Sequence, residues 1–144
     1  MKLQQLSLFL ENKPGTLRAP CETLAAARID LLTVSLADTT QFGILRFIVA
    51  DPEHARQVLQ DAGMVVRATD VVPVEVENKP GGLARVLAAI DEAGLGVEYM
   101  YDFGAASRGG KAAIIFRFED PDRALEALKA AGVRVLTSEE LLGK

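Results

Sequence analysis

The residues Glu11-Asn12-Lys13-Pro14-Gly15 return unchanged as Glu77-Asn78-Lys79-Pro80-Gly81, 66 positions later in this 144-residue chain. A second motif, Asp51-Pro52, returns as Asp120-Pro121, at an offset of 69 positions. Two motifs that recur in the same order indicate an internal repeat. Because the offset grows by three, we expect a three-residue insertion in the second copy, within the stretch 104–110.

The hydrophobic pattern predicts the same elements in both copies. Residues alternate before each pentad, as in a strand, and recur with a helical period after it. The predicted strands are 2–10, 29–37, 42–50 and 64–68 in the first copy, and 72–76, 97–103, 112–119 and 133–136 in the second. The order strand, helix, strand, strand, helix, strand occurs twice. The sequence therefore predicts an α+β fold of two ferredoxin-like βαββαβ repeats, with domains at 1–69 and 70–144.

Several helix ends are marked by their residues. Asp51 and Asp120 stand before a proline, as N-cap residues do. The stretch Thr137-Ser138-Glu139-Glu140 has the spacing of a capping box and predicts a short final helix. Gly94 suits a left-handed cap at the end of the first helix of copy two, whereas copy one has Arg28 at that place.

The composition argues against several classes of protein. Apolar residues make up 49% of the chain and charged residues 25%, which is typical of a soluble folded protein. No apolar run approaches the roughly 18 residues of a membrane span, and the first six residues do not resemble a secretory signal. The net charge of −4 and the lack of a Lys/Arg cluster argue against nucleic-acid binding. We expect a cytoplasmic protein without membrane or nucleic-acid partners.

The inventory of reactive residues is equally small. Cys21 is the single cysteine and His54 the single histidine. The chain therefore cannot form an internal disulfide and has too few such residues for a Cys/His metal site. No nucleophile stands beside a base, and no pair of carboxylates forms a catalytic motif. We therefore expect no catalytic residues, no metal and no cofactor.

The repeated pentad has two explanations. It is a competent strand-to-helix turn, and that role alone accounts for its residues. It also ends at a helix N-terminus, where backbone N–H groups without partners favour a carboxylate or phosphate. Gly15, and Gly81 with Gly82, allow an anion to approach the backbone closely. An asparagine beside them adds a donor and acceptors, which together suit a small zwitterion such as an amino acid.

With these residues the sequence resembles the ACT domain, a small regulatory module that commonly binds amino acids. The resemblance is carried by the two loops, 12–17 and 78–83, and covers nearly the whole chain. It implies a stand-alone tandem ACT protein in which two domains join edge to edge through their second strands. One eight-stranded antiparallel sheet would result, with its helices on one face and ligands at the interface between the domains.

The resemblance also implies two unequal ligand sites, each made by a loop of one domain and the start of the second strand of the other. The implied ligand-binding residues are Asn12, Pro14, Gly15, Thr16, Leu17, Gly96 and Val97 for one site, and Asn78, Pro80, Gly81, Gly82, Leu83, Asp30 and Leu31 for the other. Asp30 can accept bonds from an α-ammonium group, whereas Gly96 has no side chain. We therefore predict that the Asn78/Asp30 site is the stronger, although Asp30 also fits a solvated residue after a helix.

The leading hypothesis is a non-catalytic, allosteric regulatory protein that binds a small amino acid. The alternative is a structural or regulatory subunit that acts through a partner enzyme without a ligand of its own. Homodimerisation is also expected, because a second copy could cover a sheet edge or helix face that the pairing of the two domains leaves exposed. The sequence does not identify the amino acid, the occupancy of the two sites, the regulated target or the oligomeric state.

Overall fold

The computed structural model describes residues 3–38 and 40–142, without the side chain of Asp38. Contacts divide the chain into two compact units. One unit is Gln4–Thr69, and the other contains Asp70–Lys144 together with Met1–Leu3. The architecture is α+β, with six strands and five α-helices in the described residues.

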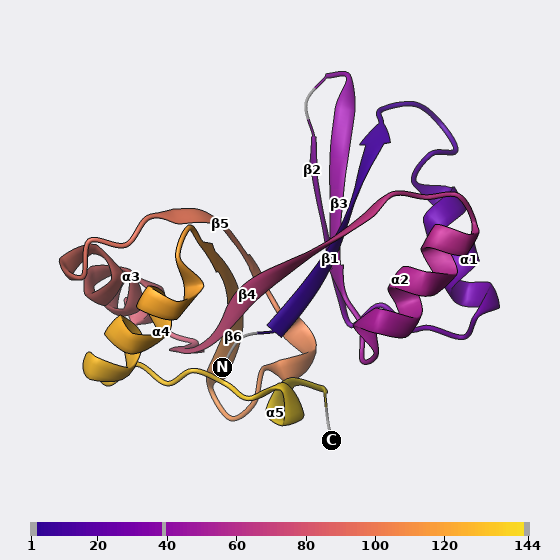
Figure 1. The fold of residues 1–144 in the computed structure, drawn as a ribbon. Coiled ribbons are helices and arrows are strands. Elements are labelled where there is room, and N and C mark those ends of the chain that lie inside the picture. The colour runs from indigo at the N-terminus through magenta and orange to yellow at the C-terminus, as the bar shows by residue number, and fades with distance from the viewer. Residues whose placement is uncertain (1–2, 39, 143–144) are drawn as a thin grey trace. The chain divides into compact units, whose positions relative to one another are not determined.

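The first unit follows the predicted order of elements. Its strands lie in the order β2-β3-β1-β4, and β1 and β2 both pair antiparallel with β3. The helices α1 and α2 lie side by side on one face of this sheet (Figure 1). The elements are β1 (Leu3–Glu11), α1 (Arg18–Ala26), β2 (Thr33–Asp38), β3 (Phe42–Ile48), α2 (Pro52–Asp61) and the beginning of β4 (Val66–Glu77). The predicted first residue of β1, Lys2, lies outside the described residues.

The second unit repeats this plan with the strand order β4-β6-β5. Its hairpin carries the predicted extra residues, which include a short 3-10 helix, η1. The elements are β4, α3 (Gly82–Glu92), β5 (Val97–Asp102), η1 (Gly104–Ala106), β6 (Lys111–Phe118), α4 (Pro121–Ala130) and α5 (Ser138–Leu142). The helices α3 and α4 again lie side by side (Figure 1).

The strand β4 corrects two predicted ranges. The strands expected at 64–68 and 72–76 form one strand, Val66–Glu77, which ends the first copy and begins the second. No glycine interrupts this segment, and valine and threonine favour an extended backbone. The chain therefore passes from one repeat to the next without leaving the strand. The eight-stranded joined sheet expected above is not observed in the six described strands.

The prediction of a strand at 133–136 is also wrong. This segment forms only an isolated bridge, Val74 to Val135. The N–H of Leu136 donates to the carbonyl of Pro73 at 2.9 Å, and the N–H of Glu75 donates to the carbonyl of Arg134 at 2.9 Å. Pro73 has no N–H to donate to the carbonyl of Leu136, so the ladder does not continue beyond this pair on that side.

Each unit has its own hydrophobic core between sheet and helices. The two cores use equivalent positions: Phe47 in β3 and Phe116 in β6 are both completely buried. The buried clusters are Leu6, Leu8, Leu24, Leu45, Phe47, Val49, Ala55 and Leu59 in the first copy, and Val72, Val74, Val76, Val86, Ile90, Phe116, Phe118, Ala124 and Leu128 in the second. Each large side chain buried there contributes about 1.5–3 kcal/mol.

The predicted caps are confirmed. The carboxylates of Asp51 and Asp120 accept from the N–H groups of His54 and Arg123, at 3.1 and 3.2 Å. Gly94 has the left-handed conformation, with φ +69°. Arg28, at the equivalent place, has φ +59° and is the only described non-glycine residue with a positive φ.

Arg28→Gly is therefore expected to stabilise the protein, by about 0.5–1 kcal/mol, because glycine adopts this conformation without a Cβ penalty. The melting temperature should rise by about 3 °C. The matched control is Gly94→Ala, which introduces the same penalty in the second copy and should lower the melting temperature by a similar amount. Differential scanning calorimetry checks both. An unchanged melting temperature for Arg28→Gly would contradict the expected strain.

Within the described ranges, none of the helices combines the length and the apolar character that crossing a membrane requires.

Candidate functional site

The first repeated loop is tied to the tip of the β2–β3 hairpin. The N–H of Asn12 donates to the carbonyl of Gln41 at 2.8 Å, and its side-chain amide donates to the carbonyl of Thr40 at 3.3 Å. Gly15 has φ +93°, a conformation that glycine adopts readily. The hydroxyl of Thr16 lies 2.6 Å from the carbonyl oxygen of Glu11. These contacts hold the loop in place at the end of β1.

The helices that follow the two loops lack the caps that other helices of the chain have. Leu17 and Gly81 occupy the N-cap positions of α1 and α3, and neither provides a side-chain hydrogen bond. Neither helix has an acidic residue in its first turn. By contrast, α2 and α4 are capped by Asp51 and Asp120. The helix ends at the repeated loops therefore retain donors and a positive dipole end for an anion.

A hollow of about 370 Å³ lies beside the first loop. Three of its ten lining residues are leucines, of which Leu17 is exposed to 41% and Leu36 to 49%. Its lining residues are Leu10, Glu11, Asn12, Lys13, Pro14, Gly15, Thr16, Leu17, Leu36 and Gly43. The structure thus joins an anion-favouring helix end to an apolar surface, which is the arrangement that an amino acid with an apolar side chain requires.

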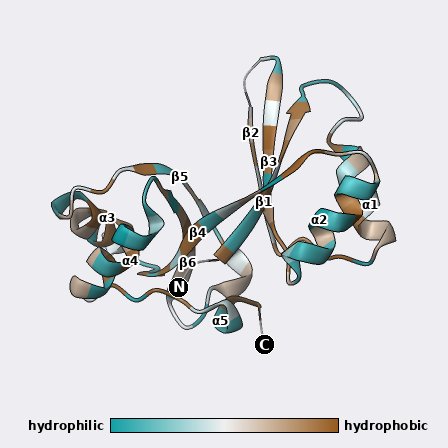
Figure 2. Cartoon of the chain, viewed as in Figure 1, coloured by the Kyte–Doolittle hydropathy of each residue, from teal (hydrophilic) through white to brown (hydrophobic). Residues whose placement is uncertain are grey.

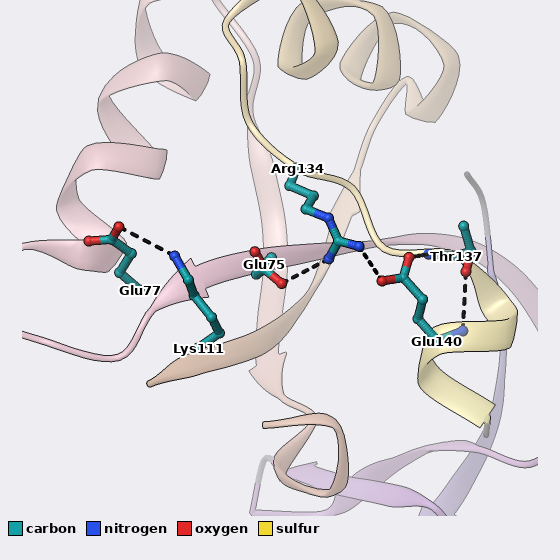
Figure 3. A network of polar contacts seen from close by, with 6 residues as sticks. All are labelled: Glu75, Glu77, Lys111, Arg134, Thr137 and Glu140. Carbon is teal, nitrogen blue, oxygen red and sulfur yellow. Dashed lines mark hydrogen bonds and ion pairs between the residues drawn. The ribbon is translucent and has the colours of Figure 1, made fainter. Parts of the chain in front are cut away.

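The second loop has the same pentad but different surroundings. Gly82 is buried, and Leu83, the equivalent of Leu17, packs against the second core. The carboxylate of Glu77 lies 2.9 Å from the Lys79 ammonium and 3.4 Å from that of Lys111. These two ammonium groups lower the pKa of Glu77, Lys79 having the larger effect. The bond between Lys111 and Glu77 is drawn in Figure 3.

The structure brings only part of the predicted site together. Asn12, Pro14, Gly15, Thr16 and Leu17 all border the first hollow. Of the second loop, Gly82 borders another hollow, of about 600 Å³, between α3 and the segment 131–134.

Four other predicted residues lie at or just before the starts of second strands. Asp30 and Leu31 come before β2, at the end away from the Asn12 loop. Gly96 comes directly before β5, and Val97 is the first residue of that strand. Their pairing with the loops of the other copy stays a prediction. Five residues that border the first hollow were not among the predicted ligand-binding residues: Leu10, Glu11, Lys13, Leu36 and Gly43. The alternation of residues in β2 predicts which face of the strand Leu36 is on. Only the register of the β2–β3 hairpin places Leu36 beside the loop.

A chain of charged side chains anchors the C-terminal helix α5 to β4. The guanidinium of Arg134 bonds the carboxylate of Glu75 at 2.8 Å and also that of Glu140 (Figure 3). Glu140 accepts from the N–H of Thr137 at 3.0 Å, and the Thr137 hydroxyl accepts from the N–H of Glu140 at 3.1 Å. The predicted capping box is therefore confirmed. The Thr137 N–H, followed by Arg134, lowers the pKa of Glu140.

Glu140→Gln is expected to lower the melting temperature at pH 7 by a small amount, on the order of 1–2 °C. The glutamine keeps the capping geometry but loses the charge beside Arg134. Because the pKa of Glu140 is lowered below its ordinary value of 4.5 on folding, the charge stabilises the fold above that pH. The deficit should disappear as the pH falls through the folded pKa.

Calorimetry of both proteins from pH 7 to pH 3 checks this expectation. Glu139→Gln, at the neighbouring acid outside the network of Figure 3, is the control. A deficit that is equally large at pH 3 would mean that the charge of Glu140 is not the cause.

The described residues contain no cluster of three or more histidine, cysteine, aspartate or glutamate side chains that could hold a metal ion. The charged groups nearest the candidate site are instead paired. Glu11 lies 3.2 Å from Lys13, and both side chains are 63% exposed. The geometry at the first loop therefore favours binding by backbone donors and apolar contacts.

Comparisons with known proteins place the fold. A family model described as an ACT domain pair matches residues 1–143. The structure is similar to that of the protein BT0572 from Bacteroides thetaiotaomicron, with 39% identity and a TM-score of 0.90, over 100% of this chain and 98% of that one. It also resembles the ligand-free regulatory subunit of aspartate kinase from Thermus thermophilus, at 18% identity and a TM-score of 0.61, over 90% and 92%. No match is found among curated proteins. The chain belongs to the family of ACT domain pairs.

Proposed function

We propose that this ACT domain pair is a non-catalytic regulatory protein that binds a small amino acid with an aliphatic side chain at the Asn12 loop. The observation that carries the proposal is the junction of an uncapped helix end with a leucine-lined hollow. ACT domain pairs are typically regulatory, and the similarity to regulatory subunits of aspartate kinase supports this class of role. Ligand-binding cavities usually start near 300 Å³, so a hollow of about 370 Å³ suits a small ligand.

Each part of the ligand has a counterpart in the loop. The α-carboxylate would lie at the N-terminus of α1, near Gly15. The side chain would contact Leu10, Leu17 and Leu36. The α-ammonium group would be bound by backbone acceptors at the start of the second strand of the other ACT domain, which for the Asn12 loop is the stretch at Gly96 and Val97.

The proposal includes the edge-to-edge, eight-stranded arrangement expected from the sequence. In the strand order, β2 and β5 stand at opposite ends and each has one described partner strand. The proposed pairing is therefore between β2 of one copy of the chain and β5 of a second copy. Binding can regulate a partner only if the ligand prefers one state of the protein. We also propose that the protein is cytoplasmic and that the partner it regulates is an enzyme.

The test is thermal unfolding of the protein with each of the twenty amino acids at millimolar concentration. A ligand at about 100 times its dissociation constant adds about 2.7 kcal/mol, which corresponds to a rise of about 5 °C or more. We expect the rise with leucine, isoleucine, valine or methionine. Leu36→Asp should abolish it, since a carboxylate in the hollow repels the ligand carboxylate and removes apolar contact.

The matched control is Val34→Asp. Val34 lies two residues away on the same face of β2, is exposed to 53%, and does not border the hollow. It should leave the shift unchanged. A shift produced only by charged or polar amino acids would contradict the proposed ligand class, and loss of the shift in both variants would contradict the proposed position.

A second candidate function, a subunit that acts through a protein partner without a ligand, is favoured by the surface of the first unit. Six of the seven large hydrophobic side chains that the described structure exposes lie there: Phe9, Leu17, Val34, Leu36, Phe42 and Val65. The absence of any thermal shift with all twenty amino acids would favour this function over the first.

A further inference from the structure

The face of the first sheet that α1 and α2 do not cover carries an apolar patch, here called the Phe9 patch: Phe9, Phe42, Ile44 and Val65. Leu8 points to the core, so Phe9 points to the opposite face. Phe9 is 67% exposed and Val65 88% exposed. The rings of Phe9 and Phe42 stack with centroids 4.9 Å apart. Figure 2 shows the hydrophobic residues at the hairpin end of β3 and at the end of β1.

The second copy shows that the fold does not need three of these four apolar side chains; the equivalent of the fourth, Ile44, is the buried Ala113. By the repeat offsets and the strand registers, the equivalent residues are Glu75 for Phe9, Lys111 for Phe42 and Arg134 for Val65. In the second copy these positions form the ionic network of Figure 3. The same backbone positions therefore accept charged side chains. Exposed apolar side chains at all three places in the first copy point to an interaction surface.

Opposite charges lie at the two ends of the Phe9 patch. Glu11 stands opposite Phe42 in the β1–β3 register, and Arg46 stands opposite Ser7. Arg67 lies at the Ser7 end, since it lines a hollow of about 280 Å³ together with Ser7, Phe9 and Val65. Glu11 pairs with Lys13, but both are exposed and such a pair contributes little. The face thus has an acidic end, an apolar centre and a basic end.

We propose that the Phe9 patch binds the same patch of a second copy of this chain. A two-fold interface must be self-complementary. If the axis runs across the strands, Phe9 meets Phe9 of the partner subunit, and Glu11 meets Arg46 and Arg67 of the partner subunit. Two sheets stacked in this way have their inner side chains in a layer about 10 Å thick. The interface borders the ligand-binding loop, because Glu11 also lines the first hollow, but it does not include residues of β2.

The test is the mass of the full chain in solution, measured by light scattering after size-exclusion chromatography and by sedimentation equilibrium. We expect twice the 15.5 kDa of one chain. The combined variant Phe9→Glu, Phe42→Lys, Val65→Arg installs the residues of the second copy and should give the mass of one chain. Met100→Lys, at a 41% exposed methionine of β5, is the control and should keep the doubled mass.

Charge reversal tests the orientation without touching the apolar residues. Arg67→Glu should raise the dimer dissociation constant by roughly tenfold or more, since a close pair of like charges replaces an attraction. Combining it with Glu11→Arg should restore most of the affinity. A wild-type mass of 15.5 kDa at 100 µM would overturn the proposal. So would a folded triple variant that remains dimeric, or a double charge reversal that is weaker than Arg67→Glu alone.

Discussion

Gly82→Ala is expected to destabilise the protein by about 3–5 kcal/mol and to lower its melting temperature by about 10 °C or more. A Cβ at this position would lie far inside van der Waals contact with the carbonyl oxygen of Glu77, and 2.9 Å from its carbonyl carbon. That carbonyl already accepts from the N–H of Lys79 at 3.0 Å. The backbone at Glu77 cannot retreat without breaking the turn that opens α3.

The matched control is Thr16→Ala, at the equivalent position of the first copy. Here the Cβ is accommodated, because α1 begins only at Arg18 whereas α3 begins at Gly82, two residues earlier in the repeat. Pro20 contributes to the late start, since it has no N–H to donate to the carbonyl of Thr16. Loss of the Thr16 hydroxyl bond should cost about 1 kcal/mol.

Thermal and urea unfolding of both variants gives the comparison. A cost below about 1 kcal/mol for Gly82→Ala would mean that the second loop can relax to the conformation of the first at little cost. The two loops would then be interchangeable forms of one turn, and the differences between their surroundings would not be set by this residue.

The repeat predicted much of this fold because it reports the same pattern twice. Each strand and helix of one copy supports the assignment of its equivalent in the other. Caps such as Asp51 and Asp120 bond backbone groups only three residues away, so they can be predicted from the local sequence. The continuity of β4 was not predictable in the same way. It depends on Thr69 and Asp70 remaining extended. Valine and threonine in this segment favour an extended backbone, but that preference alone does not distinguish one long strand from two short ones.

The candidate site also has a part that the local sequence predicts and a part that it does not. The loop Asn12–Leu17 is a local motif, and its identity with the second loop drew attention to it. Leu36 and Gly43 reach the hollow only through the β2–β3 register, a non-local property. The contrast between Phe9 and Glu75 was present in the sequence, but it became informative only once the structure placed both residues on the face opposite their cores.

Phe47→Ala is expected to destabilise the protein by about 3–5 kcal/mol, because it removes a completely buried ring from the first core. The larger question is whether the second copy unfolds with it. The assignment of domains to 1–69 and 70–144 stays a prediction. Val66 and Ala68 of β4 pack on the first core, whereas Val72, Val74 and Val76 belong to the second. Because one strand serves both cores, we expect a single cooperative transition.

The chain provides its own probe for this coupling. It has no tryptophan, and its two tyrosines, Tyr99 and Tyr101, both lie in β5 with their rings stacked at 6.4 Å. Tyrosine fluorescence therefore reports the second copy alone, whereas far-ultraviolet circular dichroism reports both. In Phe47→Ala both midpoints in urea should fall together, as they should in the control Phe116→Ala. If Phe47→Ala lowers only the circular-dichroism midpoint, the two copies unfold independently despite sharing β4. Each copy must then be stable as a unit of only about 70 residues.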